Sequence, residues 1–326
     1  MWFSRMPRRA PGFALSALLL WAAVANGDAL LQDTAAGRAA AQPSRETSAP
    51  RPRGFRKLAP GVEVTIPPDR SERETFSSHD IVELVQGVAD LKWTPKLSPT
   101  TETLYSMASQ NMFRREVWAL EFTFKPVRMI EVDLPQPTGK MQRKLIWYMV
   151  YHVKNTGAHL KPKLQEDGTY QTTPADHDLR FTPHFVLESP KYKKAYFDRI
   201  IPVAIDAIRR KEDPNRKLFD SAEIAKQTIP VTTGRVDKSV WGVATWEDVD
   251  PRVDDFSIYI QGLSNAYEWV DPPGAYKPGT SPGTGRVLTF KTLVLNFWRP
   301  GDVALERERT IYYGAPAKVD HEWIYR

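Results

Sequence analysis

The chain contains no cysteine among its 326 residues. Disulfide bonds, thiolate metal sites, cysteine nucleophiles and a lipid-modified cysteine are therefore all excluded. The sequence also lacks a glycine period, a sustained heptad pattern and a second long apolar run, which excludes collagen, coiled-coil and multispan membrane classes. Glycine is outnumbered by proline, 18 to 27. Because proline is poorly tolerated inside helices, this composition favours strands joined by long loops.

Charge of one sign is scarce in the body of the chain. Residues 1–27 contain three arginines and no acidic residue, and residues 28–57 contain six basic residues against three acidic ones. These two segments account for the whole formal net charge of +6. A nucleic-acid binder needs basic residues on its folded surface to neutralise phosphates. We therefore expect no nucleic-acid partner.

Residues 1–27 have the pattern of a signal peptide. Arg5, Arg8 and Arg9 precede the apolar run FALSALLLWAAV, which is followed by small residues up to Gly27. The run is shorter than the roughly 17 to 25 residues of a membrane-spanning helix. Cleavage after Ala25 or Gly27 would leave a mature chain with no integral membrane span, and retention as a membrane anchor is the alternative. We expect export to the periplasm, the cell envelope or the medium.

Aromatic residues are almost missing from residues 28–60, which contain only Phe55, whereas residues 61–326 contain 31. A segment rich in Ala, Pro and Arg buries too little apolar surface to offset its ordering entropy. We therefore expect residues 28–60 to be a disordered tether and the folded part to begin near Val62.

The folded part alternates apolar and polar residues with a period of two, which is typical of half-buried strands. Such runs, and one run that is apolar on both faces, are 115–124, 145–153, 181–187, 240–246, 256–260, 287–297 and 310–313. Turn residues rather than helices separate most of them, as in Asn155, Thr156 and Gly157. This order predicts a mainly β fold, an antiparallel β-sandwich of immunoglobulin-like type.

A few short helices interrupt the strands. Ser77 or Ser78 is placed to cap a helix in which Ile81, Val82, Leu84, Val85 and Val88 recur at helical spacing. A second helix is expected after Pro202 and up to Glu212. We expect two β domains, residues 61–189 with an N-terminal helix and residues 229–326, joined by a helical linker or insertion at 190–228.

The densest acidic segment is WEDVDPRVDD at 246–255, directly after a strand. Carboxylate oxygens in a loop are the ligands that calcium prefers, but the spacing departs from that of an EF-hand. The alternatives are a solvated loop without a cofactor and a calcium site. The calcium ligands would be Asp248, Asp250, Asp254 and Asp255.

Aromatic residues flank the same loop, and sugar sites combine aromatic platforms with carboxylates. Trp246, Glu247, Trp269 and Tyr276 are the candidate ligand-binding residues. Tyr276 belongs to the segment 271–285, where four Pro and four Gly predict a long hairpin loop and a contact surface. Tryptophan and tyrosine in strands also serve as core residues, so sequence alone leaves both roles open.

No catalytic motif is complete. Gly262 to Ala266 lacks the final glycine of a nucleophile elbow, and Thr280 replaces the lysine of a phosphate-binding loop. His177, between Asp176 and Asp178, is expected to be a solvated loop histidine rather than a metal ligand. No catalytic residue is assigned, and these gaps favour a binding protein over an enzyme.

The strings VWALEFTFKPVRMIEVDLPQP (117–137), IWYMVYHVKNTG (146–157) and VWGVATWEDVDPRVDDFSIYIQGLSNAY (240–267) resemble a family of uncharacterised exported bacterial proteins. VYHVKNTG is similar to the strand and turn of immunoglobulin-like sandwiches. The resemblance implies export and no particular catalytic residue.

Two functions follow from these patterns. One is a non-catalytic cell-envelope protein that binds a protein or a polymer through its loops. The other is a carbohydrate-binding module or glycoside hydrolase that uses the loop 246–255. A partner in the envelope, a protein or a polysaccharide, is expected in either case, and the sequence gives no oligomeric state.

Overall fold

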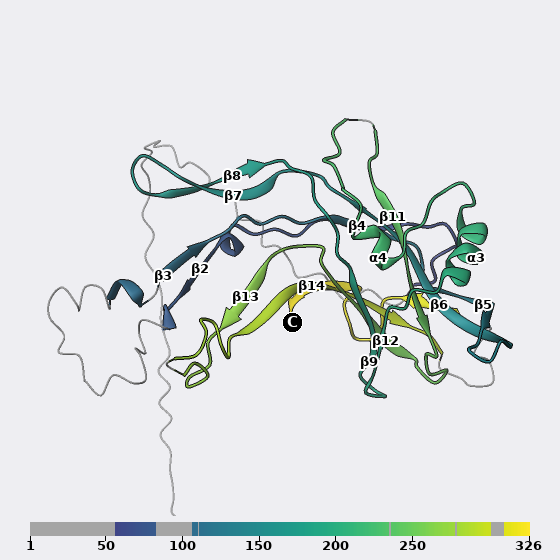
Figure 1. Cartoon of the computed structure of the whole chain (residues 1–326). Helices are drawn as coiled ribbons and strands as arrows, with labels where there is room; N and C mark the ends of the chain where they lie inside the picture. Colours follow the sequence, from purple (N-terminus) through teal and green to yellow (C-terminus); the bar gives the residue numbers. More distant parts are fainter. Residues whose placement is uncertain (1–55, 83–105, 110, 235, 278, 301–309) are drawn as a thin grey trace, which may run out of the picture. The chain divides into compact units, whose positions relative to one another are not determined.

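The structure is a computed structural model, and it describes residues 56–82, 106–109, 111–234, 236–277, 279–300 and 310–326. The described residues belong to one compact unit. They form a mainly β fold in which the paired strands run antiparallel, with three short helices (Figure 1). The prediction of a mainly β fold with antiparallel sheets and a few short helices is confirmed.

The first sheet is built around one long strand. Its strand order is β1, β4, β6, β11, and β5 pairs with the first half of β6. The central strand β6 carries the run LIWYMVYHV, which is buried on both faces as its composition predicts. The strands are β1 (Val64–Ile66), β4 (Glu121–Phe124), β5 (Arg128–Pro135), β6 (Met141–Lys154) and β11 (Val240–Glu247).

The second sheet has the order β10, β9, β12, β14, β13. The short strands β15 and β16 pair with the edge of β14 opposite β12. The first residues of β14 pair with β13, and its later residues pair with β12. The strands are β9 (His184–Ser189), β10 (Lys194–Phe197), β12 (Asp255–Gln261), β13 (Tyr267–Val270), β14 (Val287–Trp298), β15 (Tyr312–Tyr313) and β16 (His321–Tyr325). The segment 271–286 therefore joins the two strands of a hairpin, as predicted.

The two sheets share one hydrophobic core. Trp147 of the first sheet contacts Phe256 of the second with ring centroids 5.4 Å apart, and Tyr151 contacts Phe185 at 4.9 Å. Burial of these rings removes apolar surface from water and is the main stabilising term. The arrangement is consistent with a β-sandwich.

The expectation of two separate β domains is wrong. The β6 strand, from the range 61–189, pairs with β11, from the range 229–326, and β9 pairs with β12 across the same division. The segment 190–228 is an insertion, because its β10 strand joins the second sheet and its helix packs against β5 of the first. Sequence reasoning missed these pairings because strand partners are set by tertiary packing.

Within the described ranges, three complete short helices pack against the strands. They are η1 (Glu72–Thr75), α3 (Pro202–Glu212) and α4 (Ser221–Ile224). The predicted helix after Pro202 is confirmed as α3, with proline in its first turn and Ala204 and Ile208 buried. Glu212 at its end accepts hydrogen bonds from Tyr148 and Arg128 of the first sheet. Within the described ranges, no helix combines the length and the hydropathy needed to cross a bilayer.

Two small ribbons complete the fold. The first pairs β2 (Phe76–His79) with β3 (Asn111–Arg114), and the second pairs β7 (His159–Leu164) with β8 (Tyr170–Ala175). Ser77 and Ser78 lie in β2, so the prediction that one of them caps a helix is wrong. Leu84, Val85 and Val88 of that expected helix lie outside the described residues.

The N-terminal expectations fall largely outside the described residues. These are the signal peptide at 1–27 and most of the tether at 28–60. The last residues of the expected tether are ordered, because Arg56 forms a β-bridge with Tyr313 and Leu58 packs against the core. The folded part therefore begins by Arg56 rather than near Val62.

Candidate functional site

The acidic loop 246–255 is neutralised by basic residues from distant parts of the chain. Glu247 forms ion pairs with Arg199 and with Lys144, the latter at 3.6 Å. Lys144 also bonds Asp248 at 2.9 Å. The Glu247 side chain is only 10% exposed, so it is not free in solvent.

Asp250 is the most strongly held carboxylate of this loop. It accepts hydrogen bonds from the Arg252 side chain, from Lys194 at 2.7 Å and from the backbone N–H of Arg252. These bonds, with the Arg252 side chain first, hold the pKa of Asp250 well below its usual range. A carboxylate with this pKa is charged at any physiological pH and cannot act as a general acid.

The remaining two carboxylates of the loop are also paired. Asp254 bonds Lys191 at 2.5 Å, and Asp255 bonds Lys318 at 2.8 Å. The structure therefore does not bring the four candidate calcium ligands together, since each faces its own lysine or arginine. Among the described residues, no group of three or more His, Asp or Glu side chains is placed to hold a metal ion.

The aromatic candidates have different fates. Trp246 is completely buried in the core between the sheets, so its ring is out of reach of a sugar. Tyr276 lies part-buried in the loop after β13 and does not line the hollow described next. Trp269 of β13 is 7% exposed and borders a groove. It is the candidate that the structure places at a surface hollow.

The groove lies between the β2–β3 ribbon and the β13–β14 hairpin and has a cavity volume of about 400 Å³. Its lining comes from β2 and β3 and, much later in the chain, from β13 and the start of β14. The lining residues are Ser77, Phe113, Tyr267, Trp269, Arg286, Leu288 and Phe290. A neighbouring hollow of about 480 Å³ shares Phe113, Trp269 and Arg286 with it.

Trp269 holds the two sides of this groove together. Its indole N–H donates to the Ser77 hydroxyl at 3.4 Å, and its ring meets Phe113 edge-on at 5.5 Å and His79 at 4.3 Å. The guanidinium of Arg286 lies over the indole ring, 3.2 Å from its centroid. Because these groups cover most of the indole, Trp269 forms the wall of the groove and not an open platform.

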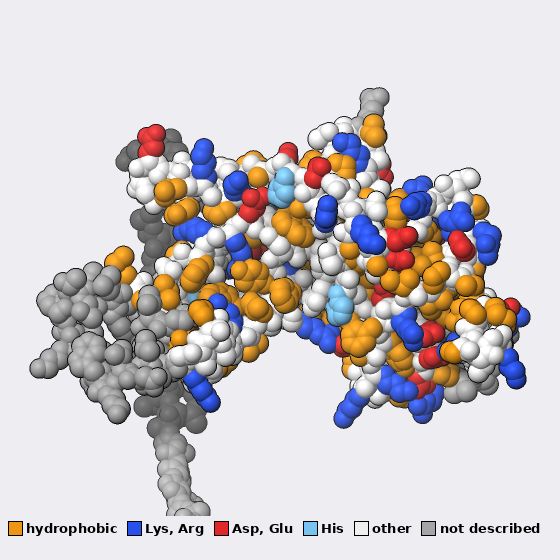
Figure 2. All heavy atoms as spheres, in the orientation of Figure 1, with side chains coloured by type: hydrophobic (Ala, Val, Ile, Leu, Met, Phe, Trp, Pro, Cys, Tyr) orange, Lys and Arg blue, Asp and Glu red, His pale blue; other side chains and the backbone are white. Residues whose placement is uncertain are grey.

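Three apolar side chains remain open to solvent in the lining. Phe113 is 38% exposed, and Leu288 and Phe290 are each 47% exposed. Figure 2 shows hydrophobic side chains gathered on the face where Figure 1 places β13 and the start of β14. A contiguous apolar patch next to a hollow marks a binding surface more often than scattered single side chains do.

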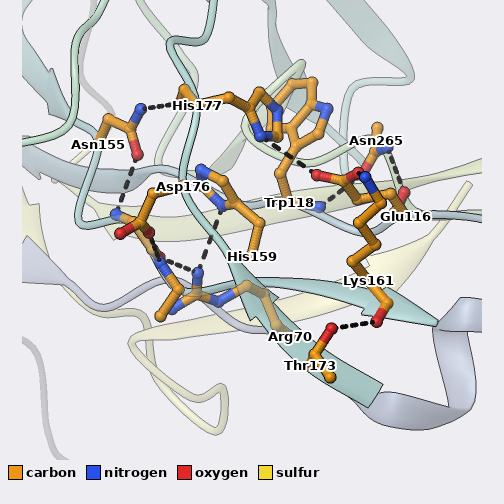
Figure 3. A network of polar contacts seen from close by, with 12 residues as sticks. Arg70, Glu116, Trp118, Asn155, His159, Lys161, Thr173, Asp176, His177 and Asn265 are labelled. Atoms are coloured by element: carbon orange, nitrogen blue, oxygen red, sulfur yellow. Dashed lines mark hydrogen bonds and ion pairs between the residues drawn. The ribbon is translucent and has the colours of Figure 1, made fainter. Parts of the chain in front are cut away.

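A second polar cluster lies where the β7–β8 ribbon joins the body (Figure 3). His159 is fully buried, its ring lies 4.7 Å from that of His177, and its Nδ1 is 3.5 Å from Arg70. Burial above all, and then the charges of His177 and Arg70, lower the pKa of His159. Asp176 accepts from the backbone N–H of Ala158 at 2.6 Å and faces Arg70.

The same cluster continues to Glu116, which pairs with His177 at 3.2 Å and with Lys161 at 3.9 Å. His177 is an exposed loop histidine, as its DHD sequence predicts, and its Nδ1 lies beside the Glu116 carboxylate. These contacts fix the β7–β8 ribbon to the segment before β4, so their role is structural. The only sequence signal for them is the polar run at 176–178.

Comparison with protein-family models, with curated proteins and with solved structures finds no match for this chain.

Proposed function

We propose that this chain is an exported, non-catalytic protein of the cell envelope that binds an extended segment of a partner polypeptide. The proposed site is the groove between the β2–β3 ribbon and the β13–β14 hairpin. The observation that carries the proposal is the apolar lining, in which Phe113, Leu288 and Phe290 stay between a third and a half exposed beside a hollow of about 400 Å³. Covering such side chains with apolar groups is favourable.

Strand edges beside the groove support a polypeptide as the occupant. Among the described residues, β3 pairs only with β2, and β13 pairs only with β14. Each therefore retains one edge of backbone N–H and C=O groups that pairs with no strand of the described ranges. An extended segment can add to such an edge through main-chain hydrogen bonds while its alternate side chains enter an apolar hollow.

The charged residues near the groove support binding over catalysis. The guanidinium of Arg286, which stacks on Trp269, donates from Nε and Nη2 to the carboxylate of Asp271 at 2.8 and 2.9 Å. The carboxylates of the acidic loop, the other candidates for chemistry, are ion-paired and do not line the groove.

Export rests on the signal pattern at residues 1–27. N-terminal sequencing of the secreted chain should begin at Asn26 or Asp28.

A random 12-residue peptide library displayed on phage provides a direct test. Peptides selected on the purified chain should carry apolar residues at alternate positions. Their affinity, measured by fluorescence anisotropy, should fall about tenfold or more with Phe290→Ser or Leu288→Ser, since each change removes most of an apolar contact. Val203→Ser is the matched control, because Val203 is 44% exposed on α3. If the selected peptides bind Phe290→Ser and Leu288→Ser as tightly as they bind Val203→Ser and the unmodified chain, the proposed site is refuted.

A further inference from the structure

The outward face of the second sheet carries a row of side chains that the core does not explain. In β9 and β12, core-facing Phe185, Leu187, Ile258 and Ile260 alternate with residues that point the other way. The register aligns Phe197 of β10, Val186 of β9 and Tyr259 of β12 as neighbours across three strands. Two aromatic side chains thus stand on either side of one small residue.

This row forms a hollow with a floor and two walls. Val186 is 7% exposed and is the floor, because β9 lies between β10 and β12. The two flanking strands are about 10 Å apart, twice the usual strand spacing. Phe197 forms one wall and is 61% exposed, although it lies on a sheet face. The cavity volume is about 130 Å³, which suits one small ring rather than a peptide segment.

The opposite wall is charged and flat. The guanidinium of Arg326 lies over the Tyr259 ring, 4.2 Å from its centroid, and it is ion-paired with Glu188 of β9. Arg326 and Glu188 both line the hollow. One wall therefore offers an aromatic face, and the other offers N–H donors and carboxylate acceptors.

Two further polar side chains border the end of the hollow. His184 and Gln261 are register neighbours and line it, and the ring of His184 lies 5.8 Å from that of Phe197. Neither side chain makes a hydrogen bond to another described residue. The imidazole and the carboxamide together supply donors and acceptors that are left for a ligand.

We infer that this hollow binds one pyranose ring of a glycan. The apolar C–H face of the sugar packs on Phe197, and its hydroxyls bond His184, Gln261 and the Glu188–Arg326 pair. A sugar ring has one apolar face and a rim of hydroxyls, so it matches a site with one aromatic wall, two polar side chains with no hydrogen-bond partner among the described residues and one ion pair at its edge. This site is separate from the peptide groove and from the loop 246–255, and it does not depend on the proposed function.

A glycan microarray probed with the purified chain, followed by saturation-transfer NMR on the glycans that bind, tests the inference. Because the site contacts one ring, we expect affinities in the millimolar range. Phe197→Ala and Gln261→Ala should each weaken binding about fivefold or more. Phe290→Ala, in the peptide groove, is the control and should bind as the unmodified chain does. Phe197 is mostly exposed, so its removal should leave the thermal midpoint nearly unchanged.

Three results would overturn the inference. They are the absence of a transfer signal from any pyranose glycan at millimolar concentration, unchanged binding by Phe197→Ala, and loss of binding in Phe290→Ala alone. Failure of the peptide site gives a different result. Peptide binding is then unchanged by the Phe290 and Leu288 substitutions, while the Phe197 and Gln261 substitutions still weaken glycan binding.

Discussion

Arg286 and Trp269 are stacked, with the guanidinium 3.2 Å from the centroid of the indole ring. The same guanidinium donates two hydrogen bonds to the carboxylate of Asp271. Trp269 lies in β13 and Arg286 immediately precedes β14, so one side chain fastens both ends of the hairpin loop. A planar, forked cation can stack and bind a carboxylate at once, which lysine cannot do.

Arg286→Lys should therefore loosen the loop 271–286 while keeping the charge. We expect faster hydrogen–deuterium exchange at the amides of this loop and weaker binding of the selected peptides, with little change in the global thermal midpoint. Exchange mass spectrometry checks the first effect. Unchanged exchange in the loop would show that the stack does not order it.

The shared core predicts that the described part of the chain unfolds as one unit. Phe256 is fully buried and contacts Trp147 and Phe297, each at 5.4 Å. Phe256→Ala should lower the free energy of unfolding by about 3–5 kcal/mol, because it leaves a cavity between the two sheets. Circular dichroism and tryptophan fluorescence should give coincident urea transitions in both proteins. Two separated transitions would restore the two-domain interpretation.

Stability should fall in mild acid because of His159. Its folded pKa is lowered by burial and by His177 and Arg70, against the opposing charges of Asp176 and Glu116. Below its unfolded value of 6.5, the unfolded chain takes up a proton that the folded chain refuses, so the free energy of unfolding drops as the pH falls.

His159→Gln removes this titration and should make the loss of stability between about pH 7.5 and pH 5 smaller than in the unmodified chain. Urea titrations at both pH values measure it. His184→Gln, which changes an exposed histidine in the same way, is the matched substitution control. An identical pH dependence in His159→Gln and the unmodified chain would rule out His159 as a source of the effect.

The acidic loop should respond unevenly to the loss of its carboxylates. The Asp250 side chain is 6% exposed and has two cationic partners, whereas the Asp248 side chain is 68% exposed. Asp250→Asn should lower the free energy of unfolding by about 1–3 kcal/mol, and Asp248→Asn by about 0.5 kcal/mol or less. Chemical denaturation measures both. Equal effects would mean that burial of Asp250 does not strengthen its ion pairs.

Much of the fold could be predicted from the sequence, because the patterns that specify it are local. The continuous apolar run at 145–153 and the helical pattern after Pro202 are examples. The strands that escaped are polar or contain proline, such as β7 with Pro162 and β8 with Pro174. Proline is tolerated in two-stranded ribbons, whose edges need no donor. Ser77 and Ser78 mimic a helix cap but pair with β3.

The site was less predictable, because its partners are distant in sequence. Trp269 and the loop after it were identified, but Ser77, its hydrogen-bond partner, lies 192 residues away. From the sequence alone, the carboxylates of the acidic loop look available to a ligand. Their partners Lys144, Lys194 and Arg199 are distant in the sequence and reach the loop only in the folded chain. Phe197, the exposed wall of the inferred sugar site, gave no signal, since its exposure depends on which face of β10 is covered.

Photocrosslinking from the groove tests the central proposal most directly. Benzoylphenylalanine replaces Leu288 in the exported chain, and Val203 on α3 is the matched position outside the groove. We predict that irradiation of intact cells yields an adduct from position 288 alone, and that mass spectrometry identifies its added mass as one polypeptide. Purified unmodified chain, added as a competitor, should reduce this adduct, and purified chain carrying Phe290→Ser should reduce it much less. Adducts that are the same from both positions, or that contain no polypeptide, would contradict the account.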